Sequence, residues 1–245
     1  MGTSKSYGGM KGTPTWSTLS STITKAVNEG HPTKLALGSV MSHTVAHLGG
    51  SHGASSGGSS TGGRAGVRSA QRLGSFIGST QSSGFSNALG QLAGGTEVKD
   101  AEEAINLILE HCAENAGVLD EIAAKAAMRE LLEEIGAEAE TIEELGEEFE
   151  AAIKEFGVEE ILVKYFGYYL FQHLCTDFYE KLIKEKGIRE TDNFYKDLKD
   201  YIIEKTKTIS KHRDMSNVDW NSEYGKELMQ EIFRDTLNAF ENYES

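Results

Sequence analysis

The chain has 245 residues, two cysteines and two prolines, and its 38 acidic against 24 basic side chains give a net charge of −14. No window approaches the roughly 18 to 20 apolar residues that a membrane span needs, which predicts a soluble protein with no membrane partner. The first residues lack the basic and apolar segments of a secretory signal, and there is no CxxC motif. We therefore expect a cytoplasmic protein in which Cys112 and Cys175 are reduced and buried.

Charge and glycine content divide the chain into two unlike parts. Residues 1–95 hold seven cations and the single acid Glu29, a net charge of +6, which leaves −20 for the rest. The first part also holds 20 of the 27 glycines. These differences predict a leader over 1–19, a Gly/Ser-rich basic region with short helices over 20–95, and an acidic helical bundle over 96–245.

The leader is too polar and too rich in glycine to fold by itself, and Trp16 is an apolar anchor near its end. Apolar residues at helical spacing then predict two short helices over 21–49, separated at Gly30 and Pro32. Because short helices with many glycines are marginal in water, we expect this region to order only against the acidic bundle or a partner.

A Gly/Ser-rich stretch over 51–63 predicts a flexible linker. The helix predicted after it, over 64–81, carries Arg64, Arg68 and Arg72 at four-residue intervals along one edge. The acidic half of the same chain is one candidate partner for these arginines, and nucleic acid is another.

The acidic half has apolar residues at helical spacing throughout and no segment that alternates with period two. Short connections between the helices, several centred on glycine, favour antiparallel neighbours, so the fold class predicted is all-α, a multi-helix bundle with a flexible basic N-terminal region. The helices are expected over 97–117, 118–136, 140–157, 158–187, 190–210 and 222–243.

Three further kinds of feature are expected in these helices: one N-terminal cap, one C-terminal end and two buried faces. Thr141 with Glu144 forms a possible capping box, and Gly187 is placed to end the most apolar helix, which we expect at the centre of the bundle. The expected apolar faces of the second and third helices include Leu119, Ile122, Ala126, Leu131 or Met128, Ile135, Ile142, Leu145, Phe149, Ile153 and Phe156.

No residue pattern indicates catalysis. His43, His47 and His52 lie four and five residues apart, but no cysteine or carboxylate accompanies them, so we predict no metal site. His111 and His173 lie on or beside apolar stripes, as core histidines do. A nucleophile elbow and a phosphate-binding loop are both missing from the sequence, which predicts a protein that is not an enzyme and needs no cofactor.

Two further partner classes are weakly indicated. Seven cations spread over 95 residues with few aromatic side chains make a poor nucleic-acid footprint, and the acidic half would repel a phosphate backbone. Gly2 and Ser6 fit the N-myristoylation pattern, but a single acyl chain anchors only weakly. We expect neither nucleic acid nor a membrane as the main partner.

Three segments in order resemble the B component of the Qat anti-phage defence system: "MGTSKSYGGMKG", "LALGSVMSHTVAHLGGS" and "GGRAGVRSAQRLGSFIG". The resemblance covers roughly residues 1–95, and the acidic half matches in general character. The sequence departs from the family around Trp16, where "TPTW" replaces a more proline-rich stretch. The resemblance implies a bacterial protein that works beside an ATPase, a QueC-like enzyme and a TatD-like nuclease.

The resemblance also suggests a role for the first residues. QueC-like enzymes activate a 7-carboxy-7-deazaguanine with ATP and let an amine attack it, and that amine could come from a protein. Removal of Met1 would leave the α-amine of Gly2, whose ordinary pKa near 7.7–8 leaves far more free base than lysine at about 10.4. A leader of about fifteen residues extends to roughly 50 Å, far enough to enter a partner's active site.

The leading hypothesis is therefore a non-enzymatic defence component that docks the QueC-like enzyme or the ATPase and receives a deazaguanine on Gly2. The residues expected to contact the partner are Gly2, Thr3, Ser4, Lys5, Ser6 and Trp16. The alternatives are an unmodified scaffold or sensor whose basic arm contacts nucleic acid or the ATPase, and a plain disordered tail with no role.

Overall fold

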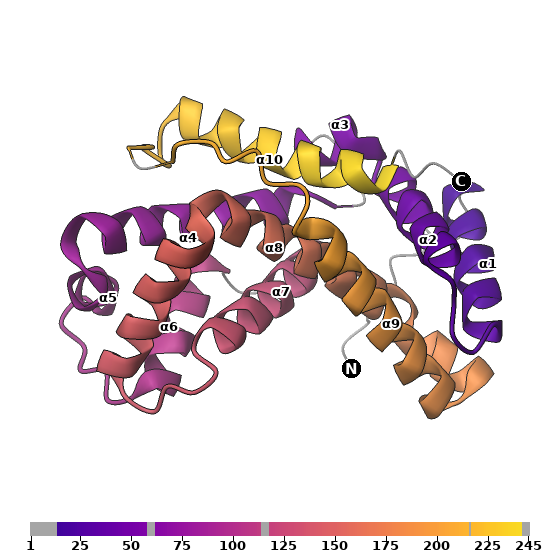
Figure 1. Ribbon diagram of the computed structural model, residues 1–245, viewed down its shortest axis with the longest axis horizontal. Helices are drawn as coiled ribbons and strands as arrows, with labels where there is room; N and C mark the ends of the chain where they lie inside the picture. The colour runs from indigo at the N-terminus through magenta and orange to yellow at the C-terminus, as the bar shows by residue number, and fades with distance from the viewer. Residues whose placement is uncertain (1–13, 58–61, 114–117, 216, 242–245) are drawn as a thin grey trace, which may run out of the picture.

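The computed structural model describes residues 14–57, 62–113, 118–215 and 217–241, which form ten helices and no strand (Figure 1). The predicted all-α class is confirmed. The helices are α1 (Pro14–Asn28), α2 (Lys34–His47), α3 (Gly50–Ser55), α4 (Arg64–Ser83), α5 (Phe85–Ala93), α6 (Ala101–Cys112), α7 (Leu119–Ile135), α8 (Ile142–Lys186), α9 (Ile188–Thr206) and α10 (Glu223–Glu241).

Helix α1 begins earlier than the leader was expected to end. Pro14 is its first residue, where the fixed φ of proline suits a helix and its missing N–H is not needed. Leu19 is buried, so the end of the segment expected to be an unstructured leader belongs to the core. The two helices predicted over 21–49 are present as α1 and α2, and the break between them lies at residues 29–33.

The predicted linker over 51–63 is also partly helical, because residues 50–55 form α3. Small side chains allow this: Ala54 and Ser55 are completely buried, and α3 packs against α10. Arg234 of α10 donates a hydrogen bond to the Ser55 hydroxyl at 3.3 Å. Residues 58–61 of the predicted linker lie outside the described residues.

Three predicted helix ends in the acidic half, at Thr141, Gly157 and Gly187, are confirmed, whereas α6 (Ala101–Cys112) and α9 (Ile188–Thr206) differ from the expected bounds 97–117 and 190–210. The Thr141 side chain accepts a hydrogen bond from the Glu144 amide, and the Glu144 side chain accepts one from the Thr141 amide, which is a capping box. Gly187 ends α8 with a φ of 91°. Within α8, Gly157 has a φ of 75° and joins two helical segments, which agrees with the two helices predicted on either side of it.

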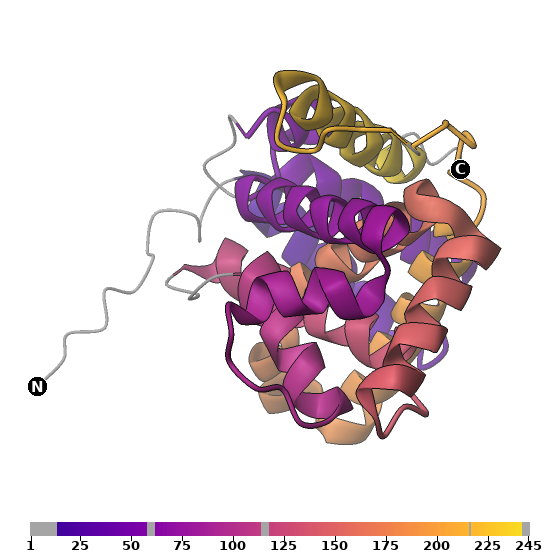
Figure 2. The same ribbon diagram turned by 90° about the vertical axis from the view of Figure 1, so that its left-hand side faces the viewer.

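The second segment of α8 is the centre of the molecule, as its apolar sequence predicted. Helices α7 and α9 pack along α8, and α4 and α10 also contact it. Figure 1 shows α5 and α6 at one end, α1 and α2 at the other, and α10 lying across the top; Figure 2 shows α10 above α4. Buried side chains from α1 to α10 belong to one continuous hydrophobic cluster.

The predicted buried face of α7 was wrong in its first half. Leu119 and Ile122 are 40% and 43% exposed. The buried residues of that half are Ala123, Ala124 and Ala127, whose small side chains let α7 approach α8 closely. The buried stripe continues with Met128, Leu131 and Leu132. Phe156, expected in the core, is 44% exposed because Gly157 ends the first segment of α8 directly after it.

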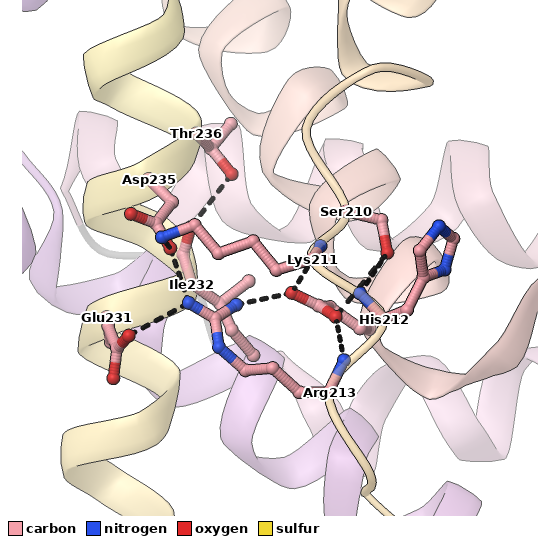
Figure 3. A network of polar contacts seen from close by, with 9 residues as sticks. Ser210, Lys211, His212, Arg213, Glu231, Ile232, Asp235 and Thr236 are labelled. Atoms are coloured by element: carbon pink, nitrogen blue, oxygen red, sulfur yellow. Dashed lines mark hydrogen bonds and ion pairs between the residues drawn. The ribbon is translucent and has the colours of Figure 1, made fainter.

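A network of charged side chains fixes the connection between α9 and α10 (Figure 3). Arg213 lies in that connection and donates to the buried carboxylate of Glu159 at the start of the second α8 segment, and to Glu231 and Asp235 on α10. The backbone amide of Arg213 also donates to Glu159, at 2.7 Å. One guanidinium therefore joins α8, the connection and α10.

Both cysteines are free, as predicted, but only Cys112 is buried and Cys175 is half-buried. Burial raises the pKa of each thiol to about 12, so both are protonated at neutral pH. No helix in the described part of the chain combines the length and apolarity needed to cross a membrane.

Candidate functional site at the root of the N-terminal arm

Most of the predicted site precedes the described residues. Gly2, Thr3, Ser4, Lys5 and Ser6 lie outside them, in residues 1–13, which we call the arm. The structure therefore describes the root of the arm, the point at which it enters the folded body at the start of α1.

Trp16 fixes that root. Its ring stacks on Phe178 of α8, with centroids 4.5 Å apart and an interplanar angle of 17°, and its edge meets His47 of α2 at 5.4 Å. Phe178 is fully buried, whereas Trp16 is half-buried. Aromatic pairs in this geometry add to the stabilisation from burial, so the first turn of α1 is held against α2 and α8.

His47 belongs to this packing. Its Nδ1 lies 3.4 Å from the Thr15 hydroxyl, and His43 is paired in the same way with Thr22 at 3.1 Å. Burial, together with the nearby His173, lowers the pKa of His47, which keeps the ring neutral at physiological pH. Among the described residues, no group of three or more metal-ligating side chains comes together.

Below this layer lies a buried polar network that joins three helices. Asp120 of α7 accepts hydrogen bonds from the Ala65 amide at 2.9 Å and the Gly63 amide at 3.2 Å, at the start of α4. From α8, the Tyr169 hydroxyl donates to Asp120, and His173 Nε2 lies 3.2 Å from the same carboxylate and 3.0 Å from the hydroxyl. The Asp120 carboxylate thus accepts hydrogen bonds from backbone amides at the start of α4, which have no acceptor within the helix itself.

These contacts determine the charge of Asp120. Burial by itself would raise the pKa of its carboxyl, but hydrogen bonds from His173, Tyr169 and the Ala65 amide outweigh burial and lower the pKa to about 2. Asp120 is therefore ionised at all physiological pH values. His173 was predicted to be a core histidine and is one, but Asp120 was not singled out, because its partners lie about 50 residues away in both directions.

The glycines at this point are required by close contact. A Cβ on Gly66 would lie 2.8 Å from the Tyr169 ring, and one on Gly63, whose φ is 108°, would lie 2.1 Å from the Ala54 carbonyl oxygen. The glycine-rich segment before and within α4 therefore brings its backbone against α3 and α8. Gly63, the last residue of the predicted linker, is therefore required by packing, and so is Gly66 in the helix predicted after it.

Two of the three arginines of α4 contact the chain's own acidic half. Arg68 pairs with Glu121 at 3.5 Å, and Arg72 donates to the His111 carbonyl oxygen at 3.3 Å. Arg64 donates to the Gly57 carbonyl oxygen at 3.5 Å. Of the two partners considered from the sequence, the intramolecular one is therefore present for Arg68.

A family model described as "Qat anti-phage system associated protein QatB" matches residues 49–240. The chain belongs to the QatB family. The match begins at α3 and includes α4 to α9 and nearly all of α10, so the family is recognised mainly through the helical body. Neither a search of curated proteins nor one of solved structures finds a match.

This result confirms the resemblance to the B component and corrects its location. The resemblance was drawn from residues 1–95, whereas residues 1–48 lie outside the matched region. The acidic half, which was expected to match in general character only, supplies most of the match. The QatB-family chain is thus an anti-phage defence component whose partners belong to the same system.

Proposed function

We propose that this QatB-family chain is the docking partner and protein substrate of a QueC-like enzyme, which joins a deazaguanine to the α-amine of Gly2. The observation that carries the proposal is the fixed root: Trp16, stacked on Phe178, holds the start of α1 on the body directly after the arm. Membership of the QatB family, which is associated with the Qat anti-phage system, supports the proposal.

The chemistry of the arm suits this role. The carboxylate of the deazaguanine attacks the α-phosphate of ATP and releases pyrophosphate, which gives an acyl adenylate. A neutral amine can then attack the acyl carbon, form an amide, lose a proton and release AMP. The α-amine of Gly2 is the least basic amine of the arm, because the ordinary pKa of a lysine such as Lys5 or Lys11 is about 2.5 higher. Gly2 also has no side chain to obstruct the attack.

The length and charge of the arm favour delivery into a partner's site. Twelve residues separate the root from the α-amine, and such a chain spans up to about 40 Å when extended. The arm contains no acidic residue, so it is not repelled by bound ATP or by a carboxylate. Thr3, Ser4, Lys5 and Ser6 would then contact the enzyme along its entrance, with Trp16 at the limit of insertion.

The test is the intact mass of the chain after expression with and without the QueC-like enzyme. We expect the mass to rise by one deazaguanine acyl group only in the presence of the enzyme, and Gly2→Glu to prevent the increase. An identical mass in both samples would contradict conjugation, and a Gly2→Glu chain that still gains the mass would place the modification elsewhere.

The unmodified scaffold remains the second candidate, in which the basic arm contacts nucleic acid or the ATPase. The positive charge of residues 1–95 favours it, whereas the engagement of Arg68 and Arg72 within the body disfavours it. Binding of the full chain to DNA or RNA in a gel shift, with affinity falling as salt rises, would support this candidate. The TatD-like nuclease is a further expected partner within the same system.

A further inference from the structure

A groove of about 450 Å³ lies on the body away from the root of the arm. The second half of α7, both segments of α8 and the end of α9 form its walls. Its floor is apolar, with Leu131, Ile135, Ile161 and Ile203 among the lining residues. Phe156 lies on its edge and is 44% exposed.

The position of Phe156 follows from the backbone. Gly157 breaks α8 with a φ of 75°, so the helix cannot carry Phe156 into the core with its neighbours. The Lys164 ammonium lies 5.8 Å from the centre of the Phe156 ring, which places a cation over one side of it. A large aromatic side chain thus stays at the edge of an apolar groove, an arrangement typical of a binding surface.

The groove also carries unbalanced negative charge. Four glutamates and two lysines line it, and one glutamate, Glu134, is already bonded to Lys164 and Tyr168. Glu148 differs from Glu134, because its Oε2 is buried and finds no hydrogen-bond partner among the described residues. A buried carboxylate oxygen without a partner is costly, so a cation or N–H donor brought into the groove would relieve that cost.

We propose that this groove is the docking site for the QueC-like enzyme, which inserts a segment carrying an apolar side chain next to a lysine or arginine. The apolar side chain would pack on Phe156 and the aliphatic floor, and the cation would pair with Glu148. This inference rests on the proposed function, because it assigns a surface to the partner that receives Gly2.

The distance between the groove and the root of the arm fits this assignment. Ile161 in the groove and Phe178 beneath Trp16 lie on the same segment of α8, seventeen residues apart. At 1.5 Å per residue that separation is about 25 Å along the helix. The arm spans up to about 40 Å, so an enzyme bound in the groove lies within reach of Gly2.

The test compares full-length variants for binding to the purified QueC-like enzyme. Phe156→Ser removes the aromatic edge, Glu148→Gln removes the buried charge, and Glu155→Lys reverses an exposed charge on the lining. Ile188→Ser is the matched control, since Ile188 is 63% exposed at the opposite end of α9 from the groove. Circular dichroism and thermal melting establish that each variant is folded.

We expect each groove variant to weaken binding at least tenfold, while the control binds as the wild type does. Glu148→Gln should also raise the melting temperature of the isolated chain, because it replaces a carboxylate whose buried Oε2 has no hydrogen-bond partner among the described residues. Wild-type affinity in folded Glu148→Gln and Glu155→Lys chains would overturn the docking site. If these variants bind the enzyme and gain the deazaguanine mass on Gly2 as the wild-type chain does, only the groove assignment fails. If no chain gains that mass, the proposed function fails.

Discussion

The carboxylate of Asp120 joins three helices beneath the root of the arm. It accepts hydrogen bonds from two backbone amides at the start of α4 and contacts two polar side chains of α8, while Asp120 itself belongs to α7. Hydrogen bonds to an ionised acceptor are among the stronger ones in proteins. A single side chain therefore controls how closely α4 approaches the centre of the bundle.

Because the pKa of Asp120 is lowered in the folded chain, the free energy of unfolding depends on pH in the acidic range. The folded pKa is about 2, below the ordinary value near 3.9, so the contribution is complete above pH 4 and is lost as the pH falls through about 2. Asp120→Asn should lower the free energy of unfolding at pH 7 by about 2 kcal/mol and flatten its dependence on pH between 4 and 2. Urea denaturation at several pH values measures both.

Glu97→Gln is the control for Asp120→Asn. Glu97 is exposed, and its change should leave the free energy of unfolding within about 0.5 kcal/mol of wild type. An Asp120→Asn chain as stable as wild type at pH 7 would mean that the carboxylate does not hold α4 in place.

At the scale of elements, glycine determines where helices turn. Gly157 divides α8 and Gly187 separates α8 from α9, with φ values of 75° and 91°. Both are in the left-handed region, which disfavours any side chain with a Cβ. The kink at Gly157 matters most, because it leaves Phe156 at the edge of the groove.

Gly157→Ala should therefore destabilise the chain by about 1–2 kcal/mol through backbone strain alone, since its Cβ would meet no atom within 4 Å. Gly90→Ala is matched to it: Gly90 lies inside α5, also has no atom within 4 Å of a Cβ, and has no positive φ. That change should be neutral or stabilising by up to about 1 kcal/mol. Equal free energies of unfolding for the two variants, measured in urea, would contradict the strain argument.

Local signals predicted helix boundaries better than helix faces. The Thr141–Glu144 capping box and the end at Gly187 depend on neighbours in sequence, and both were found. The buried face of α7 depends on which helix it meets, so Leu119 and Ile122 were misplaced. Helix α3 was missed because Gly50–Ser55 folds only where α10 covers it.

The same limit applies to the candidate site, where local features were predicted and contacts between distant segments were not. Trp16 was singled out from the sequence as an apolar anchor near the end of the leader, although its partners Phe178 and His47 could not be known. Asp120 and the groove at Phe156 depend on contacts between distant segments, which period and composition do not encode. Gly2 to Ser6 stay a prediction from the sequence.

At the scale of the whole molecule, one arginine connects parts that are far apart in the chain. Arg213 pairs with Glu159 of α8 and with Glu231 and Asp235 of α10, and Glu159 is almost fully buried. Removing one member of a buried ion pair leaves the other charge unpaired, which is more costly than the loss of an exposed pair.

Arg213→Met should lower the free energy of unfolding by about 3 kcal/mol and loosen α10 from α8. Lys34→Met provides the comparison, since its pair with Glu204 is largely exposed on both sides and should contribute less than about 1 kcal/mol. Urea denaturation measures both, with hydrogen exchange of α10 as a second readout. Similar losses for the two variants would show that the network does not connect the helices as described.

The central claim is that the helical body presents the α-amine of Gly2 for modification, and its most direct test is fragmentation of the intact chain by mass spectrometry. After expression with the QueC-like enzyme, the first N-terminal fragment should carry the mass of the deazaguanine acyl group, while Lys5 and Lys11 remain unmodified. An unmodified Gly2, or the added mass on either lysine, would contradict the account.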